Sequence, residues 1–132
     1  QFQSGKVFLE MEEWDNAEKA LQDACRLEPG NGEFLSHLAW AIYRNPGNGT
    51  SRAVIDKARR LAARALVLKR TATGFAFKGW MLIDAGQDAL AEVDFHKALK
   101  LDARHMLARR GLKAVEAKRD AERKGIFRRL FH

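Results

Sequence analysis

The chain has 132 residues, of which 31% are charged and 46% hydrophobic, and its net charge is +7. This length suits one domain with its own core and excludes two domains of ordinary size. No run of about 18 apolar residues is present, so we expect no membrane-spanning helix.

The composition, rich in Ala, Leu, Arg, Lys and Glu, favours helices. Helical spacing of the apolar residues predicts helices at about 2–11, 14–28, 33–44, 52–69, 73–84, 88–102 and 104–124. The chain opens with Gln1 inside the first helix, so we expect a piece of a longer protein. Asn31 is the expected N-cap of the third helix, and Ala85-Gly86 separates the fifth from the sixth. No segment alternates with period two, so no strand is predicted.

Small residues recur along the chain at a regular interval. Residues 14–29 and 89–103 share one pattern: Ala, a large apolar residue four later, Ala three later, then Leu. A middle copy carries Ala58, Ala62 and Ala65. Ala58 precedes Ala91 by 33 residues and follows Ala17 by 41, which indicates one period plus a seven-residue insertion at 46–52. This spacing is that of paired helices that approach closely.

These copies resemble the tetratricopeptide repeat family, in which each repeat is a helix–turn–helix unit of about 34 residues. The matching positions include Gly5, Trp14, Ala17, Leu21, Ala24, Leu38, Ala39, Ala58, Ala65, Gly79, Ala91, Phe95 and Ala98. The resemblance implies an all-α fold, a right-handed α-solenoid of three repeats with a C-terminal capping helix. We expect repeats at about 1–31, 32–71 and 72–103, a cap at 104–118 and a separate tail at 119–132.

The resemblance also implies a concave groove, lined by the first helix of each repeat, that binds a peptide or a helix. The groove would present Phe2, Lys6, Leu9, His37, Trp40, Tyr43, Arg44, Thr73, Phe77, Trp80 and Ile83. Trp40 and Trp80 occupy the same repeat position, so we expect them to be neighbours on one surface. Such a pair, rimmed by Arg44, Lys6 and His37, is typical of a binding hot spot; alternatively, the rings only pack against adjacent helices.

One branch of the family grips C-terminal carboxylates with Lys, Asn and Arg side chains. The corresponding positions here hold Phe2, Lys6, His37, Thr73 and Phe77. Only Lys6 is cationic, so binding of an acidic C-terminal tail by that clamp is not expected. The groove instead favours apolar contacts.

The last eight residues form a second candidate site. Gly125 is expected to end or bend the preceding charged helix. Beyond it, Ile126, Phe127, Leu130 and Phe131 fall on one face, with Arg128 and Arg129 opposite. This short basic amphipathic segment can dock on the body, contact a partner protein or lie on an anionic membrane.

Charge is unevenly distributed along the chain. Residues 1–33 carry 3 basic and 8 acidic side chains, residues 34–70 carry 8 and 1, and residues 104–132 carry 10 and 3. The basic C-terminal segment leaves electrostatic binding of nucleic acid or anionic lipid as the alternative to groove binding. No aromatic residue lies among its basic residues before Phe127, so we expect another protein as the partner rather than nucleic acid or a membrane. The acidic first third and the basic ends also allow head-to-tail self-association.

No chemistry-bearing motif is found. The four histidines lack metal-ligand partners at helical spacing, and Gly47-Asn48-Gly49-Thr50 lacks the ending of a phosphate-binding loop. The lone cysteine, Cys25, lies on an apolar stripe and reads as an inert thiol in a reducing compartment. We therefore expect a non-catalytic adaptor or scaffold without cofactor, metal or small-molecule substrate.

A looser similarity to bacterial multidomain proteins, in which a J-domain or signalling domain precedes such repeats, implies a cytoplasmic setting.

Overall fold

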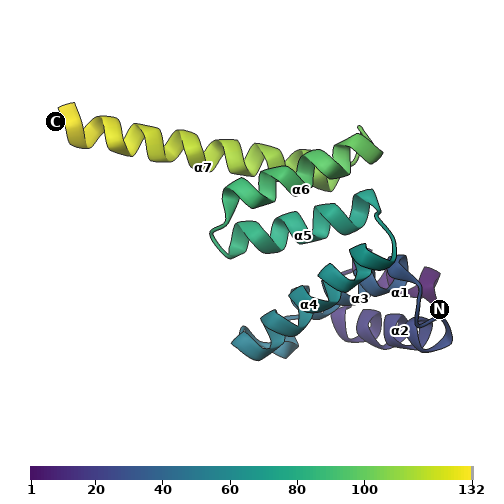
Figure 1. Cartoon of the computed structure of the whole chain (residues 1–132). Coiled ribbons are helices and arrows are strands. Elements are labelled where there is room, and N and C mark those ends of the chain that lie inside the picture. Colours follow the sequence, from purple (N-terminus) through teal and green to yellow (C-terminus); the bar gives the residue numbers. More distant parts are fainter. Residues whose placement is uncertain (132) are drawn as a thin grey trace.

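The structure, a computed structural model, describes residues 1–131, so His132, the last residue of the expected tail, lies outside the described residues. Within them the chain forms seven α-helices and one short 3-10 helix (Figure 1). The elements are α1 (Phe2–Glu10), α2 (Trp14–Leu27), α3 (Gly32–Arg44), η1 (Pro46–Asn48), α4 (Arg52–Leu68), α5 (Ala72–Asp84), α6 (Asp88–Leu101) and α7 (Met106–Phe131). The first six helices confirm the predicted ones, each bound falling on the expected residue or next to it.

Three helices begin at a side-chain cap, which satisfies amide groups that have no partner inside the helix. Asn31 caps α3 by accepting from the Phe34 amide at 3.1 Å, as the sequence predicted. Ser51 caps α4 through the Val54 amide at 3.3 Å, and Thr71 caps α5 through the Gly74 amide at 2.9 Å. These polar residues explain why each helix starts where it does.

The helices form two layers with different spacing. The first helices of successive repeats, α1, α3 and α5, contact their neighbours, and α5 also contacts α4. The second helices, α2, α4 and α6, make at most marginal contact with one another. Because the first helices converge and the second helices diverge, the first helices lie on the inner, concave side of the solenoid.

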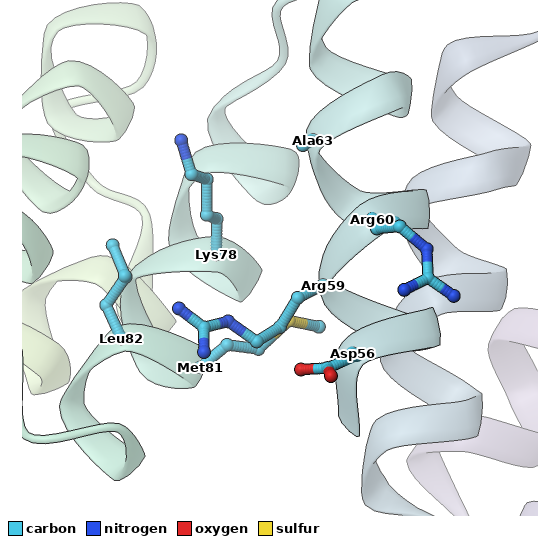
Figure 2. Close-up of a pocket in the computed structure, with 7 residues that line it drawn as sticks. All are labelled: Asp56, Arg59, Arg60, Ala63, Lys78, Met81 and Leu82. Carbon is cyan, nitrogen blue, oxygen red and sulfur yellow. The ribbon is translucent and has the colours of Figure 1, made fainter. Parts of the chain in front are cut away.

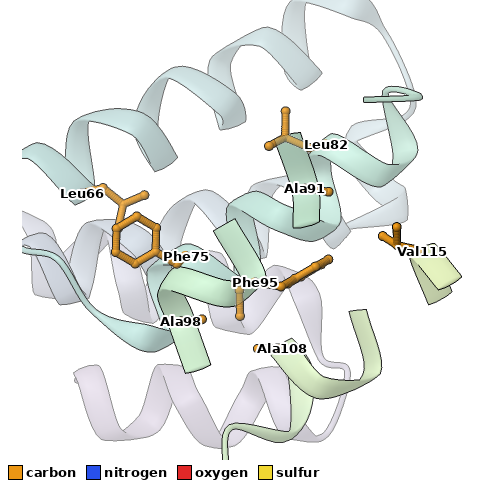
Figure 3. Packing of buried hydrophobic residues seen from close by; sticks show 9 residues of the cluster. Leu66, Phe75, Leu82, Ala91, Phe95, Ala98, Ala108 and Val115 are labelled. Carbon is orange, nitrogen blue, oxygen red and sulfur yellow. The ribbon is translucent and has the colours of Figure 1, made fainter. Parts of the chain in front are cut away.

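The core depends on the recurring small residues. Ala17, Ala58 and Ala91, at the same position of the three repeats, are all 0% exposed. Each allows a neighbouring helix to come close, which confirms the repeat register. The large ring of Phe95 fills the third repeat, where it packs among Ala91, Ala98, Ala108 and Val115 (Figure 3).

The insertion in the second repeat is held by amide side chains. Asn45 is buried, and its amide donates to Asp15 at 2.9 Å and to Glu18 at 3.1 Å. Asn48 donates to the backbone carbonyl of Ile42 at 3.1 Å and also bonds Glu18. The loop that contains η1 is therefore held to α2 of the first repeat by hydrogen bonds.

The final helix differs from the expectation. The break predicted at Gly125 is wrong: α7 runs without interruption from Met106 to Phe131, through the expected boundary at 118/119. A single glycine costs only about 1 kcal/mol inside a helix, and the flanking residues, mostly Lys, Arg, Glu, Ala and Leu, compensate for it. The distal part of α7 projects away from the body (Figure 1). None of the described helices is both long and apolar enough to span a bilayer.

Candidate functional site

A row of stacked rings crosses the first helices on the concave side. We call this row the aromatic column; its members are, in order, Phe34, Phe2, His37, Phe77, Trp40 and Tyr43. Phe2 belongs to α1, Phe77 to α5 and the other four to α3. His37 meets its neighbours edge-on, and the other contacts are stacked. Ring centroids lie 4.3 Å apart for Phe34 and Phe2, and 4.5 Å apart for Phe77 and Trp40, whose planes differ by only 5°. Such contacts stabilise beyond the area they bury.

His37 is the buried centre of the aromatic column. Its ring meets Phe2 edge-on at 5.0 Å and Phe77 at 5.3 Å. Its Nδ1 lies 2.8 Å from the carbonyl oxygen of Glu33, one turn earlier. Because a carbonyl only accepts, Nδ1 carries the proton. Burial lowers the pKa of His37 below its usual value, so the ring is neutral at neutral pH and contributes no charge to the groove.

The outer end of the aromatic column is only half-buried. Trp40 and Tyr43 stack with ring centroids 5.9 Å apart. The Tyr43 hydroxyl donates to the carboxylate of Asp84, and burial, followed by this hydrogen bond, raises the pKa of Tyr43. Tyr43 is therefore a neutral, positioned donor, and its hydroxyl ties α3 to the end of α5.

Two cations lie against rings at the ends of the aromatic column. The Lys6 ammonium is 4.9 Å from the Phe2 ring centroid. The Arg44 guanidinium is 5.5 Å from the Trp14 ring and 5.6 Å from the Trp40 ring. A cation at this distance is attracted to a ring face. The resulting surface is apolar along its length with a positive group at each end.

The structure brings together most of the groove residues named from the sequence and separates the others. Phe2, Lys6, His37, Trp40, Tyr43, Arg44 and Phe77 belong to the aromatic column or its ends. Leu9 packs into the core between the first two repeats. Trp80 and Ile83 pack into the cluster that α5 and α6 share with α7.

The expected pairing of Trp40 with Trp80 is wrong. The Trp80 indole N–H donates to the carbonyl of Leu107 at 3.0 Å, and its ring meets Phe95 edge-on at 6.1 Å. The partner of Trp40 across the helices is Phe77 instead. The two tryptophans share a repeat position but have different neighbours. Trp40 of the second repeat is covered by α5, whereas Trp80 of the third repeat is covered by α7.

Sequence reasoning missed Phe34 and Asp84, although helical spacing contained a signal for both. Phe34 lies three residues before His37, and Asp84 lies seven after Phe77, so each shares a helix face with a residue already selected. Thr73 holds one of the positions of the carboxylate clamp. Its hydroxyl lies 3.0 Å from Nε2 of His105, so it is hydrogen-bonded within the chain.

The five tail residues expected to make contacts, Phe127, Arg128, Arg129, Leu130 and Phe131, are exposed. Phe127 is 59%, Leu130 72% and Phe131 68% exposed, and the Phe127 and Phe131 rings lie 4.6 Å apart along one face. Of the three fates left open by the sequence, docking on the body is not the one seen within the described residues.

The described residues contain no group of three or more His, Cys, Asp and Glu side chains placed to hold a metal ion. Cys25 is half-buried rather than fully buried, and burial raises the pKa of its thiol. A raised pKa disfavours the nucleophilic thiolate.

No protein-family model matches the sequence, and no curated protein matches it significantly. Solved structures do match its fold. The TPR domain of Sgt2 from Aspergillus fumigatus superposes with a TM-score of 0.72 at 20% identity, covering 92% of this chain and 78% of that chain. The first TPR domain of human RPAP3 gives 0.71 at 15% identity, covering 93% and 92%.

A third match is the TPR domain of Arabidopsis OM64, with a TM-score of 0.69 at 16% identity, covering 88% of this chain and 91% of that chain. At these identities the likeness concerns the fold. It agrees with the repeat register, the small residues in phase and the two helical layers described above. The chain therefore has the tetratricopeptide-repeat fold, with three repeats closed by a seventh helix.

Proposed function

We propose that the protein is a non-catalytic adaptor or scaffold module that binds an apolar peptide or helix of another protein along the aromatic column. The observation that carries this proposal is the half-buried outer end of the column, Trp40 and Tyr43, beside Arg44 on the concave side. Aromatic and arginine side chains at the centre of an interface supply most of its binding energy. We further propose that it acts in the cytoplasm.

A structural neighbour supports protein binding in general. The first TPR of Spaghetti (RPAP3), which matches with a TM-score of 0.69 at 16% identity, is bound to an HSP90 peptide, SRMEEVD. That peptide is acidic, whereas the concave side of this chain carries a row of rings with a neutral His37 at its centre. We therefore infer an apolar ligand rather than an acidic tail.

Peptide selection from a random display library on the intact chain tests this proposal. We expect the selected peptides to be rich in aliphatic and aromatic residues and to bind saturably in fluorescence polarisation. Trp40→Ala should weaken that binding by about tenfold or more, since hot-spot truncation costs about 2 kcal/mol or more. The matched control is Trp80→Phe, because Trp80 is covered by α7 and should leave affinity unchanged.

The same assay includes the peptide SRMEEVD as the acidic competitor. We expect it not to displace the selected peptides. Displacement by SRMEEVD, or undiminished binding by a Trp40→Ala variant that keeps its helical circular dichroism, would refute the apolar groove.

A second candidate function rests on the exposed basic and apolar end of α7. Phe127, Leu130 and Phe131, with Arg128 and Arg129 opposite, could bind nucleic acid, an anionic membrane or a second copy of the chain. Binding to DNA, RNA and anionic vesicles that falls steeply with salt and requires residues 119–132 would favour it. Light scattering at two ionic strengths tests the self-association form.

A further inference from the structure

A trench separates the second repeat from the third on the side of the diverging second helices. One cavity of about 350 Å³ lies between Arg59 and Ala63 of α4 and Lys78 and Met81 of α5 (Figure 2). A second cavity of about 490 Å³ shares Ala63 and Lys78 and extends between α4, α5 and α6. Because they share lining residues, the two cavities form one continuous depression, which we call the interhelix trench.

The interhelix trench is strongly basic. Arg59, Arg70, Lys78 and Lys97 line it, against the single carboxylate of Asp56. In Figure 2, Arg59 reaches from α4 toward Met81 of α5, whereas Arg60 points away. Arg59 and Arg70 belong to a segment, residues 34–70, that carries 8 basic and 1 acidic side chains.

These cations are largely unneutralised. Among residues 1–131, neither Arg59 nor Arg70 forms an ion pair. Lys78 lies 3.7 Å from Asp94, which is 4% exposed and whose Oδ2 has no hydrogen-bond partner. This ion pair neutralises Lys78 in part, so the positive charge available to an external anion is mainly that of Arg59 and Arg70.

The floor of the trench is apolar and has helical spacing. On α4 the lining positions 56, 59, 60, 63, 66 and 67 are one, three or four residues apart, as on one face of a helix. On α5 the same holds for the positions 75, 78, 81 and 82. Two ridges with this spacing present grooves into which a third helix packs. Val67, at the rim, is 86% exposed and is available for apolar contact.

We propose that the interhelix trench binds an acidic amphipathic helix of a partner protein, with its apolar face on the exposed side chains of Ala63 and Val67 and its carboxylates toward Arg59 and Arg70. Arg59 lies nine residues, or about 14 Å, before Leu68, the last residue of α4, and Arg70 lies two residues beyond it. The helix therefore needs acidic residues at both ends of an apolar stretch of at least that length.

A nucleic acid fits this trench less well. Single strands bind by stacking bases on open aromatic faces, and the aromatic residue here, Phe75, is 3% exposed. Arg70 and Lys97 also cover its ring, at 5.1 and 5.6 Å from the centroid. The trench offers aliphatic contacts and cations, which match a peptide helix.

The trench is distinct from the aromatic column and goes beyond the function proposed above. On α5, Lys78 and Leu82 lie about 100° and 140° around the helix from Phe77 of the column, at 100° per residue. Met81 lines the trench but packs against Trp40 and Tyr43 of the column. The two sites are therefore separated through Arg59 and Arg70, which line the trench and are not members of the column.

The test measures fluorescence anisotropy of a labelled helical probe of about 15 residues, long enough to span the trench. The probe carries glutamates on one face and leucines on the other, and a second probe has lysines in place of the glutamates. We expect saturable binding of the acidic probe alone. Arg59→Glu/Arg70→Glu should weaken it by about tenfold or more, because like charges now face each other.

Two matched variants separate the trench from general effects. Arg109→Glu/Arg110→Glu makes the same charge change on exposed positions of α7, across α5 and α6 from α4 (Figure 1), and should leave affinity within about twofold. Ala63→Trp should block the trench by filling it, whereas Ala53→Trp, at an exposed position near the start of α4 that lines neither cavity, should not.

Equal weakening by both charge-reversal pairs would show diffuse attraction and overturn the proposal. So would full binding by Ala63→Trp, or a single-stranded oligothymidine that binds more tightly than the acidic probe and loses its binding in Arg59→Glu/Arg70→Glu. Circular dichroism of each variant confirms folding, and the substituted trench positions are all at least partly exposed.

Discussion

The two halves of α7 have the same secondary structure and opposite surroundings. In the proximal half, Ala108 and Val115 are 0% exposed and pack with Phe95. In the distal half, Ile126 is 49% and Leu130 72% exposed. The last ion pairs to the body, from Lys118 to Asp88 at 2.9 Å and from Arg119 to Glu92, mark where the helix leaves it.

This contrast shows that helix formation and burial are separate matters. Both halves are built from strong helix formers, so the backbone continues past the end of the body. Burial requires a neighbouring element of complementary shape. The proximal half of α7 packs against α5 and α6, and none of the described helices covers the apolar residues of the distal half. The distal half therefore carries an amphipathic face with no partner inside the described chain.

The largest expected effect comes from a glycine in each half. A methyl group at Gly111 would overlap the Phe95 ring, which Gly79 confines from another side, whereas nothing lies within 4 Å of Gly125. We expect Gly111→Ala to lower the free energy of unfolding by about 1–3 kcal/mol. Gly125→Ala should raise local helix stability by about 0.5–1 kcal/mol. Urea unfolding followed by circular dichroism measures both, and equal effects would contradict the contrast.

The start of α7 should respond to pH. Nδ1 of His105 accepts from the Ala108 amide at 3.4 Å, so the proton lies on Nε2, which donates to Thr73. Burial lowers the pKa of His105. A lowered pKa means that the unfolded chain binds the proton more readily, so stability is full above about 6.5 and falls as pH drops below it.

We expect wild type to be less stable at pH 5.5 than at pH 7.5, and His105→Asn to show a smaller difference. The substitution keeps a capping side chain. Part of the difference should remain, because burial also lowers the pKa of His37. A pH dependence identical in wild type and His105→Asn would contradict the prediction.

A smaller effect is expected where α7 leaves the body. Glu92→Gln removes the ion pair with Arg119, and both side chains are about one-third exposed. We expect a loss of about 0.2–1 kcal/mol that disappears near 1 M salt, since exposed pairs are screened. Glu116→Gln, at an exposed position of α7 without an ion pair among residues 1–131, serves as the control.

The smallest effect on stability should come from deleting the distal half. A chain that ends at Asp120 loses no residue of the buried clusters. Its global unfolding free energy should change by no more than about 0.5 kcal/mol, while the helical circular dichroism signal falls. A large loss of stability would mean that the distal half docks on the body in solution.

The sequence predicted the repeat architecture because the necessary signals are local. Ala17, Ala58 and Ala91 recur in phase, and Asn31 marks a helix start, so helix bounds and register follow without knowledge of tertiary contacts. The clustering of Phe2, His37 and Phe77 was also predictable, once the family resemblance had assigned them to first helices.

Only the tertiary structure decided which neighbour each apolar face meets. Trp40 and Trp80 share a sequence position, yet one stacks on Phe77 and the other lies under α7. The interhelix trench is a property of the gap between two helices, which no single periodicity records. Periodicity reveals that a helix has an apolar face, whereas the covering of that face depends on packing between segments distant in the chain.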